Sequence, residues 1–528
     1  MAKEQEIESG LTAAAAGATG GIACPVIMNY FDRGPACGRP LHNAPEGVDA
    51  VPVCLMHSND PGKQTAALFG EFWSQFEKIL DDAKDGYARC ERFIFPRLDL
   101  RGRTFQANCQ LVKATFTQDA DFSNTTFANE ADFAGATFIQ SAVFSNAVFS
   151  KGAIFSGAIF VQRADFRKTA FQDAHFLAAT FTQDAYFREA VFARDANLLG
   201  ATFTLVADFY KATFSQDAAF SGATFTQKAI FTDATFLRTA TWRSRFLEGA
   251  EFRRTAFAAQ VEGEPSANFG LATFAKPAEI VFDDVDLSRA LFHNCDVSEV
   301  WFTSSVRWGR RHSGRRGSHG AMVFEETIPL DQEHAKGLIR NGERDYRAIA
   351  QIYQQLKKNY DARLDYWTAN EFHFGEMEMQ RLAPRPPGRL FGLRRWRYRR
   401  LSLIALYRWG SDYGNSYGKP MAWLLASLLL FAGLFPLPRV GLERSGANYR
   451  ETYSSVWRAG NSAKERLRWE AGLVGKSLLT AVDTATFQKS PEYAPAYPWG
   501  RVLAIGEALL TSTLFALFLL AIRRQFRR

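Results

Sequence analysis

The large apolar residues in the middle of the chain recur at steps of five and six residues, mostly alternating, from Leu100 to Phe257. Phe occupies nearly every step, and a small residue, usually Ala, stands two positions before it. A helix repeats every ~3.6 residues and a strand every ~2, so neither produces this spacing. The pattern therefore predicts a repeat architecture whose interior is filled by one type of side chain.

The Ala-x-Phe-x-x unit resembles that of the pentapeptide-repeat family over residues 95–305, with a break at Gly263-Glu264-Pro265. The resemblance implies a right-handed quadrilateral β-helix with the Phe and Ala side chains inside and polar residues at the corners. This chain has Phe where the family commonly has Leu, and a sixth residue at every other step. We expect the extra residue at alternate corners, and coils that stack at ~4.8 Å.

Some members of that family resemble duplex DNA and bind DNA gyrase, which requires a strongly acidic surface. Between Leu111 and Ala258 the chain has 14 acidic and 14 basic residues. The predicted rod is therefore neutral, and neither DNA mimicry nor nucleic-acid binding is expected. A protein partner on the β-helix surface is the interaction that this part of the chain favours.

Two helices are predicted after the rod, following a stretch at 303–320 whose Arg, Gly and Ser content indicates a flexible linker. The first helix has one apolar face, formed by Ile349, Ile352, Tyr353, Leu356 and Tyr360. The second begins near Asp365, and the pair resembles a single tetratricopeptide-type hairpin. His373, Glu376 and Glu378 in the second helix are interpreted as ordinary side-chain partners rather than metal ligands.

Two apolar segments near the C-terminus predict membrane spans. Met421–Leu437 has 17 uncharged residues, and Val502–Ile522 has 21 residues with one acid, Glu507. The first follows ten basic residues and one acid between Arg381 and Lys419, and the second precedes Arg-Arg-Gln-Phe-Arg-Arg. Such basic flanks suit anionic phospholipid headgroups, and they favour a two-span topology with both termini in the cytoplasm.

A short apolar segment between the spans, Gly472–Val482, predicts a re-entrant helix. The order span, short helix, span resembles the two-span pore module of potassium-type channels over residues 420–528. The family's filter reads Thr-x-Gly-Tyr-Gly, whereas the stretch beginning at Thr484 has no glycine, so potassium selectivity is not expected. The resemblance implies a homo-tetramer whose pore-lining candidates are Thr480, Asp483, Thr484, Thr486 and Glu507. The alternative is that Asp483 caps an interfacial helix and Glu507 snorkels.

Four potential metal ligands, Cys24, Cys37, Cys54 and His57, stand within 34 residues. The last two are separated by only two residues, a spacing that lets both side chains reach one ion. Sulfur and imidazole ligands in a tetrahedral set suit structural Zn²⁺. His42 is an alternative to Cys24, and free buried thiols with a surface His are the alternative to a metal site. Cys90, Cys109 and Cys295 are predicted to be small core residues.

Composition sets outer limits on these predictions. The 528 residues carry a formal net charge of +8 and are 22% charged and 47% hydrophobic, which excludes a largely disordered chain. The acidic start, MAKEQEIESG, lacks the pattern of an export signal, and the chain has no phosphate loop, nucleophile elbow or dinucleotide fingerprint that would indicate an enzyme.

The predicted architecture is therefore multi-domain: a zinc-knuckle-like segment at 1–92, a β-helix at 93–305, a linker at 306–340, a helical hairpin at 341–382, a basic juxtamembrane collar at 383–419 and a two-span domain at 420–528. The chain resembles bacterial pentapeptide-repeat proteins with a pore-like C-terminal domain. The function expected is a cation channel of the bacterial inner membrane, regulated by its cytoplasmic β-helix. The alternative is a membrane-anchored binding scaffold without conduction.

Overall fold

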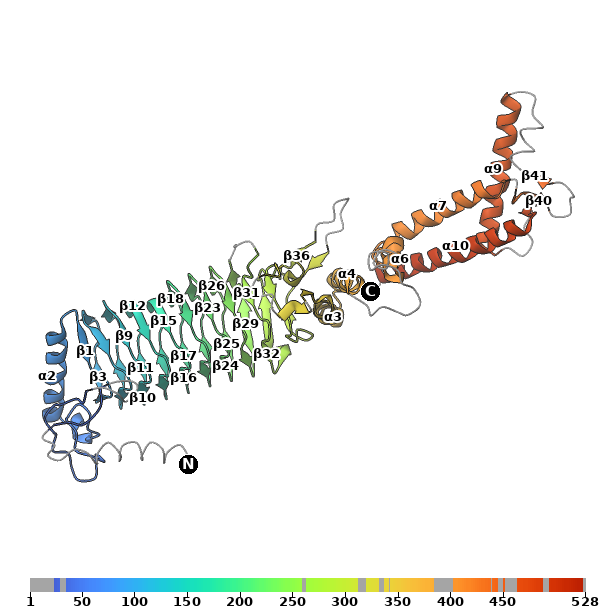
Figure 1. Ribbon diagram of the computed structural model, residues 1–528. Coiled ribbons are helices and arrows are strands. Elements are labelled where there is room, and N and C mark those ends of the chain that lie inside the picture. The colour runs from blue at the N-terminus through green and yellow to red at the C-terminus, as the bar shows by residue number, and fades with distance from the viewer. Residues whose placement is uncertain are drawn as a thin grey trace. The chain divides into compact units, whose positions relative to one another are not determined.

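The computed structural model describes residues 23–28, 35–258, 263–311, 320–331, 337–340, 342–383, 402–437, 439–444, 450–451, 463–487 and 493–525. The chain divides into two compact units, Met1–Gln355 and Leu356–Arg528, and the boundary falls inside helix α3 (Tyr346–Ala362). The first unit holds the strands of a β-solenoid and the second holds a set of helices (Figure 1).

Four columns of short parallel strands form the solenoid, and the chain visits the columns in turn in each coil. The first column comprises β1 (Tyr87–Arg89), β5 (Asn108–Gln110), β9 (Ala131–Asp132), β12 (Val148–Ile154), β15 (Ala170–His175), β19 (Ala196–Asn197), β23 (Ala218–Ala219), β27 (Ala240–Thr241), β31 (Ala267–Asn268) and β34 (Ala290–Leu291). The second comprises β2 (Ile94–Phe95), β6 (Thr115–Phe116), β10 (Thr137–Phe138), β13 (Ile159–Phe160), β16 (Thr180–Phe181), β20 (Thr202–Phe203), β24 (Thr224–Phe225), β28 (Arg245–Phe246) and β32 (Thr273–Phe274).

The third column comprises β3 (Leu98–Asp99), β7 (Ala120–Asp121), β11 (Ala142–Val143), β14 (Ala164–Asp165), β17 (Ala185–Tyr186), β21 (Ala207–Asp208), β25 (Ala229–Ile230), β29 (Ala250–Arg253), β33 (Ile280–Asp283) and β35 (Trp301–Phe302). The fourth comprises β4 (Thr104–Phe105), β8 (Thr126–Phe127), β18 (Val191–Phe192), β22 (Thr213–Phe214), β26 (Thr235–Phe236) and β30 (Ala256–Phe257), together with the first residues of β12 and β15. The 10-stranded third column shows a solenoid of about ten coils.

Stacked phenylalanine rings fill the solenoid, because most Phe residues pair in register with a Phe one coil away. The ring of Phe138 lies 4.5 Å from that of Phe116 and 4.8 Å from that of Phe160, with the planes within 2° of parallel. Within a coil, neighbouring rings meet edge to face, as Phe138 and Phe144 do at 81°. The Ala residues two positions before each Phe are buried beside the rings, and their small size leaves the room that the rings occupy.

The backbone conformation at the corners of the solenoid accounts for the alternation of five- and six-residue steps between successive Phe residues. Between Phe116 and Phe166, a stretch described throughout, each five-residue step contains one residue with positive φ, and no six-residue step does. The positive-φ residues there are Asn124, Gly135, Asn146 and Gly157, which are the residue types that adopt this conformation at least cost. The extra residue therefore enters at alternate corners. Strands β12 and β15 each continue from the fourth column into the first, which joins the two columns into one sheet. Their pairing shifts register between Phe149 and Gly152, because the step from Phe149 has six residues and the step from Phe171 has five.

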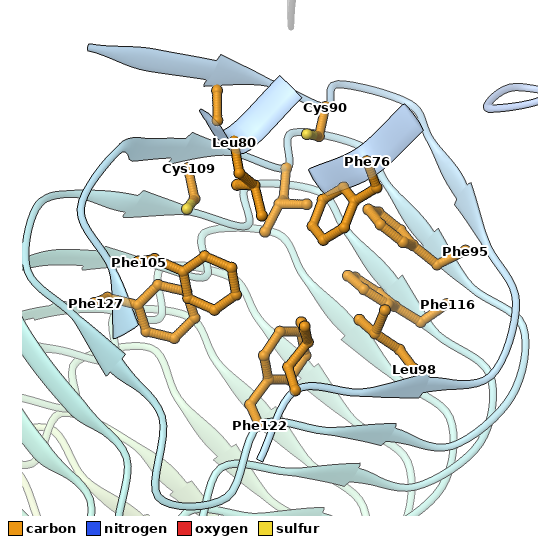
Figure 2. Close-up of a pocket in the computed structure, with 13 residues that line it drawn as sticks. Phe76, Leu80, Cys90, Phe95, Leu98, Phe105, Cys109, Phe116, Phe122 and Phe127 are labelled. Carbon is orange, nitrogen blue, oxygen red and sulfur yellow. The ribbon is translucent and has the colours of Figure 1, made fainter. Parts of the chain in front are cut away.

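Helix α2 (Ala66–Ala83), preceded by the 3-10 helix η1 (Pro61–Gln64), covers the N-terminal end of the stack. Phe72 and Phe76 place their rings edge-on to Phe95 at 5.6 and 5.4 Å. Figure 2 shows Phe76 and Leu80 of α2 pointing into the solenoid, where Leu and Cys replace some of the Phe rungs. The cavity left among them is about 10 Å³, so these smaller rungs make room for the helix and the interior stays closely filled.

The C-terminal end of the stack is covered by residues that the sequence assigned to a flexible linker at 306–340, and that assignment is wrong for the described part. Strands β36 (Gly309–Arg310) and β37 (Ala321–Met322) pair antiparallel, and the 3-10 helix η3 (Phe324–Glu326) follows. The carboxylate of Glu325 is buried and accepts the Phe292 N–H. The Arg and Gly content of this stretch gave no sign of the cap. Residues 312–319 and 332–336 lie outside the described part. A small hairpin, β38 (Ile339–Arg340) and β39 (Glu343–Arg344), leads to α3.

In the second unit, α3 and α4 (Tyr366–Leu382) pack as a hairpin through Tyr360 and Phe372. Helix α6 (Leu403–Ser411) comes next, and residues 384–401 of the predicted collar lie outside the described part. Helices α7 (Gly418–Leu434), α9 (Ala463–Ala485) and α10 (Pro498–Gln525) then pack together, with β40 (Leu442–Arg444), β41 (Arg450–Glu451) and β42 (Tyr493–Pro495) in a small antiparallel sheet between them in the chain.

Helices α7 and α10 run antiparallel. Phe431 near the end of α7 belongs to a buried cluster on which Leu503 and Ala504 near the start of α10 pack. Leu473 and Ala481 of α9 complete that cluster, so α9 contacts both apolar helices. Helix α9 has 23 residues, whereas the sequence predicted only a short apolar segment at Gly472–Val482. The prediction fell short because the first residues of α9 are charged and do not belong to the apolar segment.

One helix of the described chain is long and apolar enough to cross a membrane: Pro498–Arg524, with a mean hydropathy of 2.0. Only 28% of its most apolar stretch is buried, whereas the core helix of a soluble protein is mostly covered. The other predicted span lies on α7, an apolar helix of 17 residues, which is shorter than this criterion requires. The structure thus supports one candidate membrane-spanning helix in place of the two predicted.

Candidate metal centre and membrane-helix residues

A two-stranded ribbon brings Cys24 and Cys37 together despite the twelve residues between them. Isolated bridges join Ala23 to Pro40 and Ile27 to Ala36, in antiparallel sense. The Cys24 N–H donates to the Arg39 carbonyl at 2.8 Å. The two cysteines therefore lie side by side on neighbouring strands, which explains how such a wide spacing serves one site.

A tight turn presents Cys54 and His57, because the His57 N–H donates to the Cys54 carbonyl at 3.0 Å. The ligand atoms of Cys24, Cys37, Cys54 and His57 all lie within 4.8 Å of one another. His57 Nδ1 is 3.4 Å from Cys24 Sγ and 3.2 Å from Cys54 Sγ, and the Sγ atoms of Cys37 and Cys54 are 3.8 Å apart. Tetrahedral zinc with Zn–S near ~2.3 Å and Zn–N near ~2.05 Å places its ligand atoms about 3.6–3.8 Å apart. This donor set fits that ion.

Hydrogen bonds from neighbouring groups orient His57 and favour the thiolate form of Cys37. His57 Nε2 donates to the Glu91 carbonyl at 3.1 Å, which leaves Nδ1 as the free donor atom for a metal. Arg39 Nη1 donates to Cys37 Sγ at 3.1 Å and brings a positive charge to the sulfur. Hydrogen bonds from the Cys24 and Cys54 thiols lower the pKa of Cys37. The thiolate that a metal requires is therefore favoured at this position.

His42, the alternative ligand, lies outside the cluster. Its Nε2 is 2.8 Å from Asp60 Oδ2, and Asp60 in turn caps η1 by accepting the Gly62 N–H at 2.7 Å. The structure therefore selects Cys24 over His42. Cys90, Cys109 and Cys295 are buried in the solenoid as predicted, and burial raises the pKa of Cys109 to about 12. These thiols are protonated core residues.

The pore-lining candidates on α9 do not form one open polar surface in the single chain. Thr480 and Asp483 are buried, Thr484 is half-buried, and Thr486 is exposed. The hydroxyls of Thr480 and Thr484 donate to carbonyls one turn back in their own helix, at 2.9 and 2.8 Å. Thr486, just after α9, does the same with the Val482 carbonyl at 2.8 Å. All three threonines therefore satisfy their donors locally, and Asp483 is the candidate left to meet an ion or a neighbouring copy.

Glu507 on α10 is a predicted pore-lining residue that lies in the interior of the single chain. Its side chain is fully buried, and neither carboxylate oxygen has a hydrogen-bond partner among the described residues. Thr511, one turn later, is also buried and donates to the Glu507 carbonyl at 2.8 Å. Sequence reasoning placed this residue in the helix correctly, but which face α7 and α9 cover depends on packing.

Sequence reasoning missed a junction at Glu378, which it treated as a helix-surface residue. The Glu378 carboxylate accepts hydrogen bonds from Arg381 Nε at 3.2 Å, Arg408 Nη1 at 2.9 Å and Tyr413 Oη at 2.9 Å. Burial opposes its ionisation, but the Arg381 hydrogen bond and the charge of Arg408 outweigh burial and hold the pKa of Glu378 below its ordinary value. Arg524 Nη1 donates to the Tyr413 carbonyl at 2.6 Å, so α4, α6 and the end of α10 meet here.

Comparison with known families identifies the solenoid. A family model described as pentapeptide repeats, in nine copies, matches residues 101–142, 122–170, 166–210 and 199–244. No curated protein and no solved structure gives a significant match to the chain. The central part of the chain is therefore a pentapeptide-repeat β-solenoid, and the helices outside it are interpreted from their own residues.

Proposed function

We propose that the chain is a membrane protein whose helical unit supplies one subunit's share of a cation-conducting pore, regulated by the β-solenoid. The observation that carries this proposal is the packing of α9 against both apolar helices, α7 and α10. The end of α9 carries Asp483, Thr484 and Thr486, which are the residue types that hydrated cations meet in a pore.

A bilayer is the proposed partner because the outer surface of these helices is apolar. Leu509 on α10 is 65% exposed, and Leu425, Leu429 and Leu430 on α7 are also exposed. Soluble proteins rarely expose such a continuous apolar patch. The basic residues around 381–419 and 523–528 favour the inner bacterial membrane with both termini in the cytoplasm. Because α7 has only 17 residues, its crossing would require a locally thin bilayer or flanking residues that snorkel.

A pore requires several copies, because two helices from one chain cannot surround a channel. Four copies would bring four Asp483 carboxylates around one axis, and such a ring attracts cations. The first test is the subunit count of the detergent-solubilised protein by native mass spectrometry. A tetramer supports the proposal, and a monomer overturns it.

The second test compares cation flux into proteoliposomes for the natural protein, Asp483→Asn and a control, Thr513→Val. Thr513 is exposed on α10 and its hydroxyl donates to its own helix. We expect Asp483→Asn to lower the flux and Thr513→Val to leave it unchanged. Equal flux for both variants would show that Asp483 does not line the pathway.

A membrane-anchored binding scaffold is the second candidate, and the burial of Glu507 and Thr480 favours it. In that case the helices hold the solenoid at the membrane, and its surface binds a protein. A tetramer that conducts no ions at any membrane potential would support this function over the first.

We propose that Cys24, Cys37, Cys54 and His57 hold a structural zinc ion. Four protein ligands leave no open position for water, so the ion would supply a cross-link rather than a catalytic centre. The cross-link would join the N-terminal ribbon to the turn at Cys54, which is fastened to the first coil by the Ile94 N–H to Met56 carbonyl hydrogen bond at 2.8 Å. Elemental analysis of the purified protein tests the site.

A further inference from the structure

Helix α6 has one side that packs against the rest of the helical unit. The Tyr407 ring meets the Tyr413 ring edge to face at 5.8 Å. Gly410 approaches α10 so closely that an added Cβ would lie 3.4 Å from Leu517 Cδ1. Ser411 is buried as well. This side of α6 is thus fixed by contacts with the 411–416 turn and α10.

Three large apolar residues of α6 are nevertheless uncovered in the single chain. Leu403 is 85% exposed, Leu406 49% and Trp409 62%. Their spacing of three residues places them along one face of the helix. A helix that meets water normally carries polar residues on its outer face. An apolar face of this kind needs an apolar environment to cover it.

The neighbouring residues indicate what that environment is. The Trp409 ring lies 4.0 Å from that of Trp423 on α7, which makes the apolar face of α6 continuous with the exposed apolar surface of α7. Arg408 is half exposed beside this face and donates to Glu378, and Lys419 is exposed at the start of α7, where it pairs with Asp412 at 2.6 Å. The sequence has five further Arg at 394–400, outside the described residues. A tryptophan pair at the edge of an apolar face, in a part of the sequence that is rich in Arg, is typical of the boundary between acyl chains and anionic headgroups.

We infer that α6 is an interfacial helix that lies in an anionic phospholipid leaflet, with Leu403, Leu406 and Trp409 at the acyl boundary. This inference rests on the proposed membrane location of α10. The bilayer that covers the exposed apolar surface of α7 would cover this face too, because the contact between Trp409 and Trp423 makes the two surfaces continuous. The Arg-rich sequence before α6 suits anionic headgroups, and a second copy of the chain is the occupant that the test must exclude.

The Glu378 junction connects α6 to the helical hairpin of α3 and α4. Arg408 of α6 donates to Glu378 of α4 at 2.9 Å, so α4 is tied to the helix that meets the lipid. A change in the lipid surface that moves α6 is then transmitted to α4 through one buried carboxylate.

The test uses the full-length protein in nanodiscs of phosphatidylcholine and phosphatidylglycerol, with Leu406→Cys carrying an environment-sensitive fluorophore. We expect lipid with a spin label near the headgroup to quench the probe, and aqueous iodide to leave it bright. Leu177→Cys is the matched control, an exposed leucine on the solenoid, and should be quenched by iodide only. The unsubstituted protein measures labelling of the natural cysteines, and Trp409→Cys repeats the measurement if Leu406→Cys does not fold.

A probe at Leu509→Cys on α10 separates this inference from the proposed function. Quenching there by lipid labelled deep in the acyl chain places α10 in the bilayer, and its absence would overturn the membrane location itself. If α10 is quenched but the Leu406 probe is open to iodide, the interfacial helix is wrong. If the Leu406 probe is shielded from iodide and from labelled lipid, another copy covers α6, and the inference is also overturned.

Discussion

The solenoid and the helical unit treat their large apolar side chains in opposite ways. Phe160 in the solenoid is fully buried between equivalent rings of its own chain, whereas Leu509 in α10 is mostly exposed. Each coil of the solenoid therefore completes its core with its neighbours and needs nothing else. The helical unit buries a seam between α7, α9 and α10 and leaves large apolar side chains on the outer surface of α7 and α10 exposed.

Metal removal should have the largest effect, and it should be confined to the solenoid side of this comparison. We expect Cys54→Ser to abolish zinc binding, because it removes one of the four proposed ligands. The loss of stability should be large, since structural zinc contributes roughly 10–16 kcal/mol of apparent binding free energy in small zinc domains. The ribbon and the turn should then lose hydrogen-exchange protection, while α7 and α10 keep theirs. Elemental analysis and hydrogen exchange measure both results.

Cys109→Ser is the control for the metal, since Cys109 is buried in the solenoid outside the cluster. This variant should keep the zinc. Equal metal content in Cys54→Ser and the natural protein would contradict the site.

The phenylalanine stack should give the next largest effect. We expect Phe160→Ala to lower the free energy of unfolding of the solenoid by about 3–5 kcal/mol, because it opens a cavity between Phe138 and Phe181. Its neighbour Ile159 points outward, so Ile159→Ala should change that free energy by less than about 0.5 kcal/mol. Denaturant titration of the two variants compares them, and similar losses would mean that the stack is not the source of stability.

The stabilities of the two units should depend on pH with opposite signs. Burial raises the pKa of Glu325 from 4.5 to about 7, so the folded solenoid cap keeps a proton that the unfolded chain has released. Its stability should fall by on the order of 3 kcal/mol as the pH rises from 4.5 to 7, and Glu325→Gln should remove this slope.

The pKa of Glu378 is shifted the other way, below its ordinary value, so the junction of α4 and α6 should lose stability as the pH falls. Hydrogen exchange across a pH series reports each unit separately. Slopes of the same sign in both units would contradict the comparison.

The smallest effect should come from the corners. Ala178 and Gly157 both have positive φ, 54° and 66°. Ala178→Gly should raise the free energy of unfolding by about 1 kcal/mol, because it removes the steric cost of a Cβ in this conformation. Gly157→Ala should lower it by a similar amount, since an added Cβ there meets no atom within 4 Å and only the backbone term remains. Thermal unfolding of the two variants checks the opposite signs.

The solenoid could be predicted from the sequence because the same spacing of large apolar residues recurs in every coil. About thirty such positions between Leu100 and Phe257 agree, so a few exceptions do not obscure the pattern. Sequence reasoning identified the four residues of the Cys/His cluster from residue type, but the choice between Cys24 and His42 required the ribbon that pairs Ile27 with Ala36. It failed for Glu325 and Glu378, whose burial comes from segments distant in the sequence that close over them. It also failed for the length of α9, where charged residues mask a helix that its neighbours stabilise.

The in-register stacking of the coils also bears on how such a chain can change over evolutionary time. Phe116, Phe138 and Phe160 occupy one position in three successive coils. Loss of residues 138–159 from the gene would set Phe160 directly on Phe116, and a duplication would insert one more coil between unchanged ends. Replication slippage in the gene can therefore lengthen or shorten the solenoid by whole coils, each of which changes its length by ~4.8 Å.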